Sequence, residues 1–390
     1  MCPALEFKNV RYAYPNSPLS LNGVTFSLTK GTKVALVGPN GAGKTTLLLM
    51  CNGILRPEAG TVIFNGDPIR YDSTSLRELR KKIGLVFQNS DSQLFAPTVY
   101  QDVAFGPVNL GMDKTEVKAL VTRGLNAVGL AGYEKRPPHQ LSGGEKKRAA
   151  IAGILVMEPE VLIFDEPTSA LDPTGAADLM ELLDELNTQG KTIIISTHDV
   201  ELAYNWADDI ILMNHGVVVH QGPPEAVFTD PQLITTTSLR TPAVIEIYTE
   251  LVARKMLDPS SGAPKSILHL VNTLEQRFNH HDLTGVYGSI TVCNVDMVPV
   301  DRIHAWLKRC PSHRRGAMGS RAKSLAEREK IALDFTYGVI DKCILRALIG
   351  ESSLILTSEG MVKRVERRVL VFDEESGISI SVQSMEESES

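Results

Sequence analysis

Several features are missing from this sequence. No uninterrupted apolar run approaches the roughly 20 residues that a membrane-spanning helix needs, and the opening residues, Met-Cys-Pro-Ala-Leu-Glu, lack the basic and then apolar pattern of a secretion signal. The five cysteines are scattered without a Cys-x-x-Cys pair, which favours free thiols in a reducing cytosol over a disulfide framework. The formal net charge of −6 argues against binding nucleic acid through bulk charge. We therefore expect no nucleic-acid partner, and any work at a membrane would be done through a partner.

A glycine-rich stretch is the strongest motif. It reads Gly38-Pro-Asn-Gly-Ala-Gly-Lys-Thr-Thr46 and fits Gly-x-x-x-x-Gly-Lys-Thr, the phosphate-binding loop of P-loop nucleotidases. An apolar run of strand length precedes it and a helical pattern follows, so backbone N–H groups and the positive end of a helix would face the same anion. Lys44 can reach the β- and γ-phosphates, and the Thr45 hydroxyl can ligate Mg²⁺. The predicted nucleotide-binding residues here are Gly38, Pro39, Asn40, Gly41, Ala42, Gly43, Lys44, Thr45 and Thr46.

Two acids and a histidine follow later strands. Residues 161–164 form an apolar run that ends in Asp165 and Glu166. Carboxylates at the carboxyl end of a buried strand lie at the ligand crevice of an open α/β sheet, so Asp165 would hold Mg²⁺ through water and Glu166 would point at the γ-phosphate side. A second buried strand, residues 191–196, delivers His198 to the same edge. A lone histidine is more often structural, but the two neighbouring acids make this one a candidate for chemistry.

The run Leu141-Ser-Gly-Gly-Glu-Lys-Lys-Arg148 marks the start of a helix. Ser142 and Glu145 lie three residues apart, which predicts a capping box. The capping box does not explain Gly143 and Gly144, because glycine costs backbone entropy and is expected where something must approach closely. A phosphate at this helix N-terminus is the natural candidate.

The remaining pattern of the first part predicts its organisation. Residues 5–12 and 24–30 are expected to form a small antiparallel sheet. Tyr14 follows the first of these, and its spacing alone leaves adenine stacking and a half-buried strand tyrosine equally open. Residues 99–158 predict a helical insert between strands of a parallel core, broken at Gly106-Pro107 and at Arg136-Pro-Pro-His139.

With these pieces in order, residues 4 to about 230 resemble the ATP-binding cassette (ABC) ATPases. Leu141-Ser-Gly-Gly-Glu145 is similar to that family's signature motif. The P-loop, Gln88, Asp165-Glu166, Asp172 and His198 fall where the family's motifs fall. The resemblance implies an ATP hydrolase with ATP and Mg²⁺ as cofactors and an α/β fold. That fold has a parallel core sheet, an antiparallel β subdomain and a helical insert.

The resemblance also implies a role for each site residue. Glu166 would activate the attacking water, His198 would sense the γ-phosphate, and Lys44 would complete the catalytic set. Gln88 would contact Mg²⁺ and report to a partner, and Tyr14 would stack on adenine. In this family two cassettes pack head to tail, so Ser142, Gly143 and Gly144 of one copy would bind the γ-phosphate held by the other. Only one P-loop and one signature occur here, so a second cassette, identical or paralogous, is needed.

A narrower likeness follows Gln88. The run from Gln88 to Val99, then Asp102-Val-Ala-Phe-Gly-Pro107, looks like the energy-coupling-factor transporters, and among these like the cobalt and nickel uptake type. Ser90 and Ser92 stand where that family commonly has Pro and Asp. The likeness implies a peripheral ATP-hydrolysing subunit on the cytoplasmic face of a membrane. There it would drive uptake of cobalt, nickel or a vitamin through a transmembrane coupling subunit and a substrate-binding membrane subunit.

Two other functions are alternatives. One is a soluble ATPase of the same superfamily that acts in DNA repair, translation or cofactor assembly. Repair members carry long coiled coils inside the cassette and translation factors usually carry two cassettes, and neither feature is present. The other is a non-hydrolysing, nucleotide-gated scaffold, against which the intact Lys44, Glu166 and His198 argue.

The sequence predicts further parts beyond the cassette, which we place at residues 1–230. Residues 231–264 are expected to form a helical segment and linker. Residues 265–384 are expected to form a smaller α+β accessory domain of ferredoxin-like type with a regulatory role. An acidic tail follows at 385–390.

Within the accessory domain we expect strands at 331–337 and at 369–372, among others. The basic segment 309–323 is interpreted as a mobile, solvated loop rather than an anion site. A metal sensor built from His280, His281 and the later cysteines is disfavoured, since their spacing fits no metal-site pattern.

Overall fold

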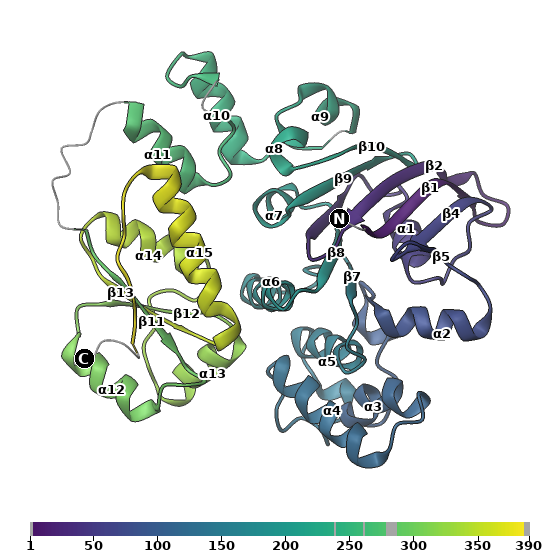
Figure 1. The fold of residues 1–390 in the computed structure, drawn as a ribbon, viewed down its shortest axis with the longest axis horizontal. Coiled ribbons are helices and arrows are strands. Elements are labelled where there is room, and N and C mark those ends of the chain that lie inside the picture. Colours follow the sequence, from purple (N-terminus) through teal and green to yellow (C-terminus); the bar gives the residue numbers. More distant parts are fainter. Residues whose placement is uncertain (1–2, 238, 260–261, 278–286, 386–390) are drawn as a thin grey trace. The chain divides into compact units, whose positions relative to one another are not determined.

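The computed structural model describes residues 3–237, 239–259, 262–277 and 287–385 (Figure 1). The chain divides into two compact units, one of residues 1–179 and 190–245 and the other of residues 180–189 and 246–390. Helices α6 (Pro173–Thr188) and α10 (Ala243–Ala253) run through the boundaries between these units. None of the described helices is both long and apolar enough to cross a membrane.

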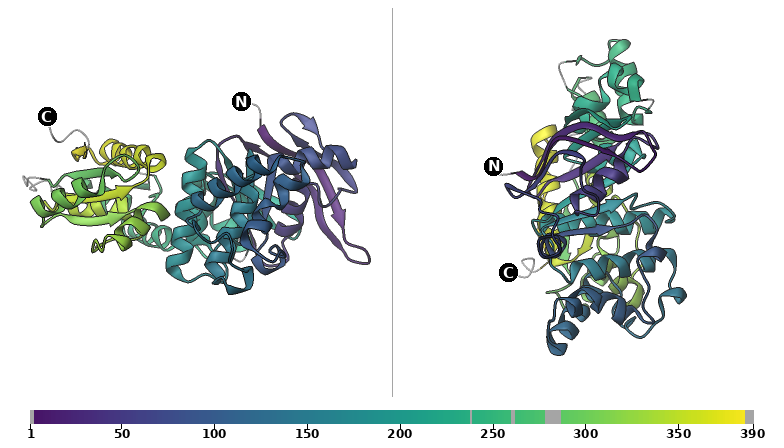
Figure 2. Two further views of the ribbon diagram at one scale, coloured as in Figure 1. Left: turned by 90° about the horizontal axis from the view of Figure 1, so that it is seen from below. Right: turned by 90° about the vertical axis from the view of Figure 1, so that its right-hand side faces the viewer.

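The first unit begins with an antiparallel sheet. Its strands are β1 (Pro3–Ala13), β2 (Leu19–Thr29), β4 (Ala59–Phe64) and β5 (Asp67–Pro68), in the order β2-β1-β4-β5. Figure 2 shows β1 and β2, in purple, side by side along their length. The small antiparallel sheet expected from the sequence is confirmed.

A second sheet of this unit is mainly parallel, and its strands are largely buried apart from the edge strand β10. Its order is β10 (Val217–Gly222), β9 (Asp209–Asn214), β3 (Lys33–Val37), β8 (Thr192–Thr197), β7 (Val161–Asp165) and β6 (Ile83–Val86). Only β10 pairs antiparallel, with β9. Because β3, β7 and β8 run in one direction and pair Val37 with Thr197 and Asp165 with Ser196, their carboxyl ends meet at one edge.

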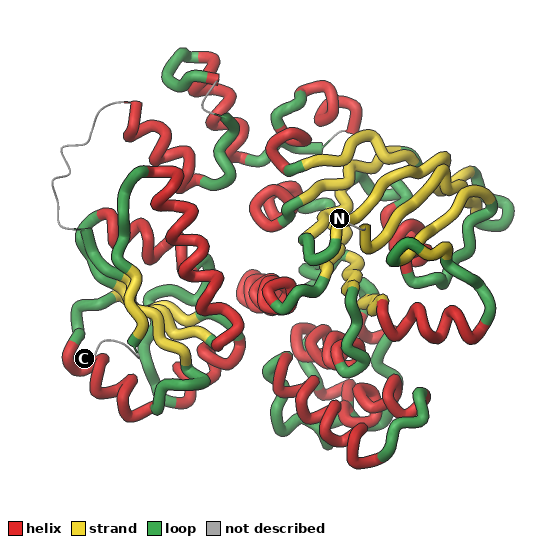
Figure 3. The backbone as a smooth tube through the Cα atoms, in the orientation of Figure 1, coloured by secondary structure: helices red, strands yellow, loops and turns green. Residues whose placement is uncertain are grey.

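Helices cover this sheet and form the insert. The covering helices are α1 (Lys44–Cys51), α2 (Ser73–Lys82), α7 (Val200–Trp206), α8 (Pro224–Phe228) and α9 (Pro231–Thr237). The insert holds α3 (Val99–Asn109), α4 (Lys114–Ala127) and α5 (Gly143–Leu155), with short 3-10 turns η1 (Ser90–Ser92) and η2 (Pro138–Gln140). Figure 3 shows the insert as an all-helical region beside the strands of the same unit. The predicted insert between strands β6 and β7 is confirmed.

The predicted break at Gly106-Pro107 is wrong, because α3 continues through Pro107 to Asn109. Proline removes one helical hydrogen bond and crowds the carbonyl four residues earlier, but Pro107 lies only two residues before the end of the helix. The following N–H groups of Leu110 and Gly111 bond the carbonyls of Gly106 and Val108.

The second unit contains a parallel sheet in the order β12 (Arg314–Ala317), β13 (Ser353–Thr357), β11 (Ile290–Asn294) and β14 (Val382–Ser384). Its helices are α11 (Ile267–Arg277), α12 (Val300–Arg309), α13 (Ser320–Arg328), α14 (Val339–Leu348) and α15 (Glu359–Ser376). The unit contains both helices and strands, as the predicted α+β domain requires, but each described strand pair is parallel. The ferredoxin-like arrangement, which is antiparallel, is therefore wrong.

Other predictions for this unit also fail. Residues 369–372 lie inside α15, where Val365, Val369 and Phe372 are buried at helical spacing and Leu370 is exposed. Residues 331–337 form no strand beyond an isolated bridge at Phe335. The first segment is helical and the second is a loop, and neither could be told from a strand because a short apolar run has no decisive period.

The basic segment 309–323 is not a loop, since it supplies β12 and the start of α13. Arg314 pairs with Glu351 at 2.9 Å and with Asp334 at 3.3 Å, so its charge is matched locally. Cys293 and Cys343 pack into two different apolar clusters of this unit, and the described residues hold no group of three or more metal-ligating side chains. His280, His281 and residues 386–390 lie outside the described part of the chain.

Candidate active site

The glycine-rich loop joins the end of β3 to the start of α1. Gly41 and Gly43 have φ of 81° and 98°, which other residues rarely adopt. A Cβ atom on Gly38 would lie 2.3 Å from the Met213 carbonyl oxygen, and one on Gly43 would lie 2.7 Å from the Ser20 carbonyl oxygen. The loop therefore needs glycine for its close packing as well as for its turn.

Lys44 and Thr45 begin α1 at the centre of this site. The buried Lys44 amine donates to the carbonyl oxygens of Gly38 at 2.7 Å and Pro39 at 3.2 Å, inside the loop. Burial lowers the pKa of this amine, and the nearby Glu166 and Asp165 carboxylates act in the opposite direction. The Thr45 hydroxyl donates to Asp165 Oδ2 at 2.9 Å. A hydroxyl and a carboxylate oxygen in contact form the hard donor set that suits Mg²⁺.

The two acids at the end of β7 are held by Ser196 from β8. The Ser196 hydroxyl donates to Asp165 Oδ1 and accepts the Glu166 N–H at 3.0 Å. Glu166 has a φ of 47°, a left-handed conformation that costs energy for a residue other than glycine and is found most often at functional sites. Both of its carboxylate oxygens lie 3.0 Å from His198 Nδ1. The backbone strain and these bonds fix the direction in which the Glu166 carboxylate points.

These residues line one cleft of about 320 Å³. Its lining comprises Ser20, Asn40, Gly41, Ala42, Gly43, Lys44, Thr45, Thr46, Gln88, Asp165, Glu166 and His198. The structure thus brings residues 40–46 of the predicted P-loop together with Gln88, the two acids and the histidine, whereas Gly38 and Pro39 do not line the cleft. Tyr14 does not line the cleft, but its hydroxyl lies 3.4 Å from Thr46 Oγ1 at the adjoining surface.

The signature residues line a different hollow of the same unit, of about 340 Å³, together with Lys147 and Asp172. The predicted capping box is confirmed, because Ser142 Oγ accepts the Glu145 N–H at 3.3 Å and Glu145 Oε2 accepts the Ser142 N–H at 2.7 Å. A Cβ atom on Gly143 or Gly144 would lie no closer than 3.7 Å to any described atom outside the adjacent residues and the backbone of α5. No close approach within the described part of the chain therefore requires these glycines, and no residue is shared between this hollow and the P-loop cleft.

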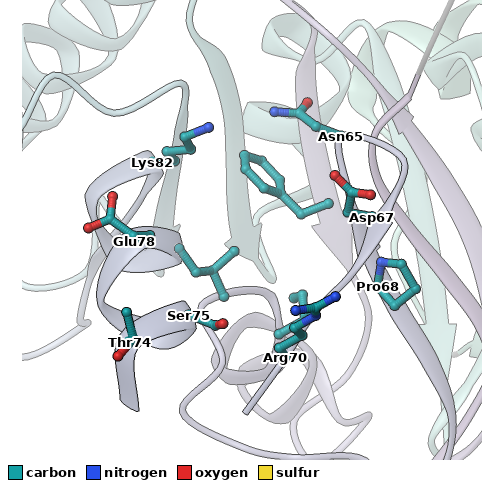
Figure 4. A pocket seen from close by; sticks show the side chains of 11 residues that line it. Asn65, Asp67, Pro68, Arg70, Thr74, Ser75, Glu78 and Lys82 are labelled. Atoms are coloured by element: carbon teal, nitrogen blue, oxygen red, sulfur yellow. The ribbon is translucent and has the colours of Figure 1, made fainter. Parts of the chain in front are cut away.

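A larger hollow, of about 590 Å³, lies elsewhere on the first unit (Figure 4). Figure 4 shows Asn65, Asp67 and Arg70 on one side and Glu78 and Lys82 of α2 on the other. Its lining includes none of the P-loop, acid, histidine or signature residues. Volume alone would thus select a hollow without the predicted site residues. The oxygen and nitrogen donors of the smaller cleft make it the better candidate for nucleotide binding.

Sequence reasoning missed Ser20, Ser196 and Lys147. Ser196 could have been found, because it is a polar residue near the end of an apolar strand at the ligand edge. The same pattern identified Asp165. The Ser20 hydroxyl lies 2.9 Å from Thr46 Oγ1 only because β2 packs beside the P-loop, and no local pattern marks it. Lys147 is described below.

A parallel sheet that delivers a glycine loop, two acids and a histidine to one edge defines an α/β nucleotide hydrolase of the P-loop class. Residues 21–169 match the ABC transporter family. The chain is 51% identical to the energy-coupling factor transporter ATP-binding protein EcfA2 of Methanospirillum hungatei, over 99% of this chain and 97% of that one.

Solved structures of ABC transporter proteins are also similar to this chain. The chain is similar to CbiO1 of Clostridium perfringens, described as part of the ABC transporter complex CbiONQ, with 40% identity and a TM-score of 0.56 over 64% of this chain and all of that one. It is also similar to a dimeric ATP-binding cassette (MJ0796) bound to ADP and Pi, with 29% identity and a TM-score of 0.51 over 56% and 98% of the two chains. This chain belongs to the ATP-hydrolysing, energy-coupling factor subunits of the ABC transporter family.

Proposed function

We propose that two cassettes share their nucleotide sites, and that the pair drives uptake of cobalt, nickel or a vitamin through membrane partner subunits. The observation that carries this proposal is the separation of the P-loop cleft from the signature hollow. Each holds part of a phosphate site, so a second cassette is needed to complete either one. The dimeric cassette among the similar structures supports the same arrangement.

The residues present fit ATP with Mg²⁺. The loop N–H groups and Lys44 would hold the β- and γ-phosphates, and Tyr14 would stack on the adenine ring. Thr45, Asp165 through water, and Gln88 would hold Mg²⁺, which neutralises charge on the phosphates when bound. Glu166 would accept a proton from the attacking water at its carboxylate, and His198, which contacts that carboxylate, would sense the γ-phosphate. Ser142, Gly143 and Gly144 would bind the γ-phosphate held by the partner cassette.

An exposed apolar surface supports docking of a membrane subunit. Phe95 and Phe105 are 65% and 50% exposed, and their rings meet edge to face with centroids 4.9 Å apart. The buried Asp102 accepts the N–H groups of Phe95 and Ala96, each at 2.9 Å, and so fixes the loop that presents Phe95. We propose that this pair, which follows Gln88 in sequence, contacts a helix of the coupling subunit. The protein would then work as a peripheral subunit on the cytoplasmic face of the membrane.

Co-purification tests this surface. Changing Phe95 and Phe105 together to Ala should abolish recovery of the chain with its membrane subunits, while ATP binding by the purified chain is retained. Tyr337→Ala, which removes another exposed aromatic ring, is the matched control and should leave the complex intact. Recovery of the double variant at the wild-type level would contradict the proposed dock.

For residues 265–384 we propose regulation or stabilisation of the dimer. The position of these residues after the cassette supports this role. The similarity to the protein of Methanospirillum hungatei, which covers 99% of this chain, extends over these residues as well.

A further inference from the structure

One buried cation connects the two hollows of the cassette. Lys147 lies on α5, two residues after Glu145, and lines the signature hollow. Its amine donates to the main-chain oxygens of Gln88 at 2.9 Å and Phe87 at 3.3 Å. Gln88 in turn lines the P-loop cleft. A single side chain thus contacts the signature side and the main chain of a nucleotide-cleft residue.

The position is costly for a lysine. The residue is only 3% exposed, and burying an ammonium group is unfavourable unless hydrogen bonds and opposite charges compensate. Burial lowers the pKa of Lys147 to about 8, while Asp165 and Glu166 act in the opposite direction. An apolar residue of similar size would avoid burying a charge, but it would leave the main-chain oxygens of Phe87 and Gln88 without this donor. The neighbouring Lys146 forms a more exposed pair with Asp91, at 2.6 Å.

We propose that Lys147 is a positioning residue for ATP hydrolysis, which ties the signature helix α5 to the main chain at Gln88. The idea rests on the shared-site arrangement proposed above. In such a pair, the P-loop cleft of a cassette binds one nucleotide. The signature hollow of the same cassette contacts the second nucleotide, which the partner cassette binds. The hydrogen bonds from Lys147 on α5 to the main chain at Gln88 therefore connect the two nucleotide sites. When the pair closes around one nucleotide, these bonds help to position the residues around the second.

Steady-state kinetics of the full chain with its partners test the proposal. Lys147→Met keeps the length of the side chain but removes the donor. We expect its kcat to fall about 10- to 100-fold, the scale of a small misplacement in an active site, with the KM for ATP changed less than about threefold and a lower Hill coefficient. Lys118→Met, an exposed lysine on α4, is the matched control and should hydrolyse ATP as the wild type does. Wild-type kcat in Lys147→Met would overturn the inference.

A double-mutant cycle with Gln88→Ala separates positioning from general stability. If Lys147 acts through Gln88, the double variant should be no slower than the slower single variant. Rate losses that multiply would instead show that Lys147 acts independently, which contradicts the proposal. Lys147→Gln retains a donor without charge and should recover most of the rate; a variant as slow as Lys147→Met would contradict the role of the hydrogen bond.

A readout without nucleotide completes the test. Backbone hydrogen exchange over residues 87–95 of the full chain should become faster in Lys147→Met and stay unchanged in Lys118→Met. Unchanged exchange in Lys147→Met would contradict the tie. These outcomes can be told apart from failure of the shared-site model. That model is contradicted if the wild type hydrolyses ATP as a single cassette. Only the inference about Lys147 is overturned if wild-type hydrolysis is cooperative and Lys147→Met has the same kcat and Hill coefficient as the wild type.

Discussion

At the scale of the residue, the proposed hydrolysis depends on how the Glu166 carboxylate is positioned. It follows a buried strand, takes a left-handed conformation and contacts Ser196 through its N–H and His198 through its carboxylate. Each of these contacts comes from β8 or the segment after it. The position of the acid is therefore set by strand pairing rather than by its own loop.

Replacing Glu166 by Gln should abolish turnover but preserve ATP binding, since the amide keeps the size of the side chain and loses the proton acceptor. We expect kcat to fall by at least about 10²-fold, as for removal of a well-placed group from an active site. Phosphate release and nucleotide affinity measure the two effects. Glu160→Gln, at an exposed carboxylate that pairs with Lys82, is the control. Near wild-type hydrolysis by Glu166→Gln would remove that residue from the proposed role.

Ser196→Ala tests the support of the two acids. It removes the buried hydroxyl that donates to Asp165 Oδ1 and leaves the Glu166 N–H with only the Ser196 carbonyl oxygen, at 3.2 Å. The free energy of unfolding should therefore fall by about 1–3 kcal/mol, and kcat should fall as well. Urea denaturation and phosphate release measure these changes. Ser73→Ala, at an exposed position at the start of α2, should change stability by less than about 0.5 kcal/mol. Equal stability of both variants would show that the Ser196 bonds contribute little.

At the scale of the element, motifs with a fixed local mechanism were predictable. The P-loop and the capping box at Ser142 depend on residues close in sequence, and both form as expected. The carboxyl ends of β7 and β8 were also predictable, because a parallel sheet places them at one edge. Lys147 was not, since its partners at Phe87 and Gln88 are about 60 residues away.

The errors in the second unit share one cause. The run Val369–Phe372 is rich in residues that favour strands, but tertiary packing places Val369 and Phe372 on the buried face of α15. Arg314 of β12 pairs with two acids that lie 20 and 37 positions further along the chain. The apolar content of residues 369–372 therefore wrongly predicted a strand, and the basic charge of residues 309–323 wrongly predicted a loop.

The start of α5 can be tested with two substitutions at Ser142. Ser142→Ala removes the cap and should cost about 0.5–2 kcal/mol of stability, whereas Ser142→Asp keeps a good cap but places negative charge where the γ-phosphate would bind. We expect Ser142→Asp to remain stable and lose hydrolysis, with ATP affinity of the single chain unchanged in both variants. Denaturation, phosphate release and a binding titration measure these properties. A large loss of single-chain affinity would contradict a signature that acts on the partner's nucleotide.

At the scale of the whole molecule, the residues that line the P-loop cleft, which we propose to bind ATP, all lie in the first unit. A solved relative that matches this chain over only 64% of its length is covered completely by the match. We therefore expect a chain truncated after residue 258 to bind ATP with wild-type affinity, as a titration with a fluorescent nucleotide would show. Loss of binding in a folded truncated chain would make the second unit part of the catalytic unit.

The central claim is that ATP joins two cassettes by linking the P-loop of one to the signature of the other. The most direct measurement is the mass in solution of Glu166→Gln with its membrane partners, ATP and Mg²⁺. We predict that two cassettes are present in each particle, and that they separate when ATP is replaced by ADP. A single cassette per particle with ATP bound would contradict the claim.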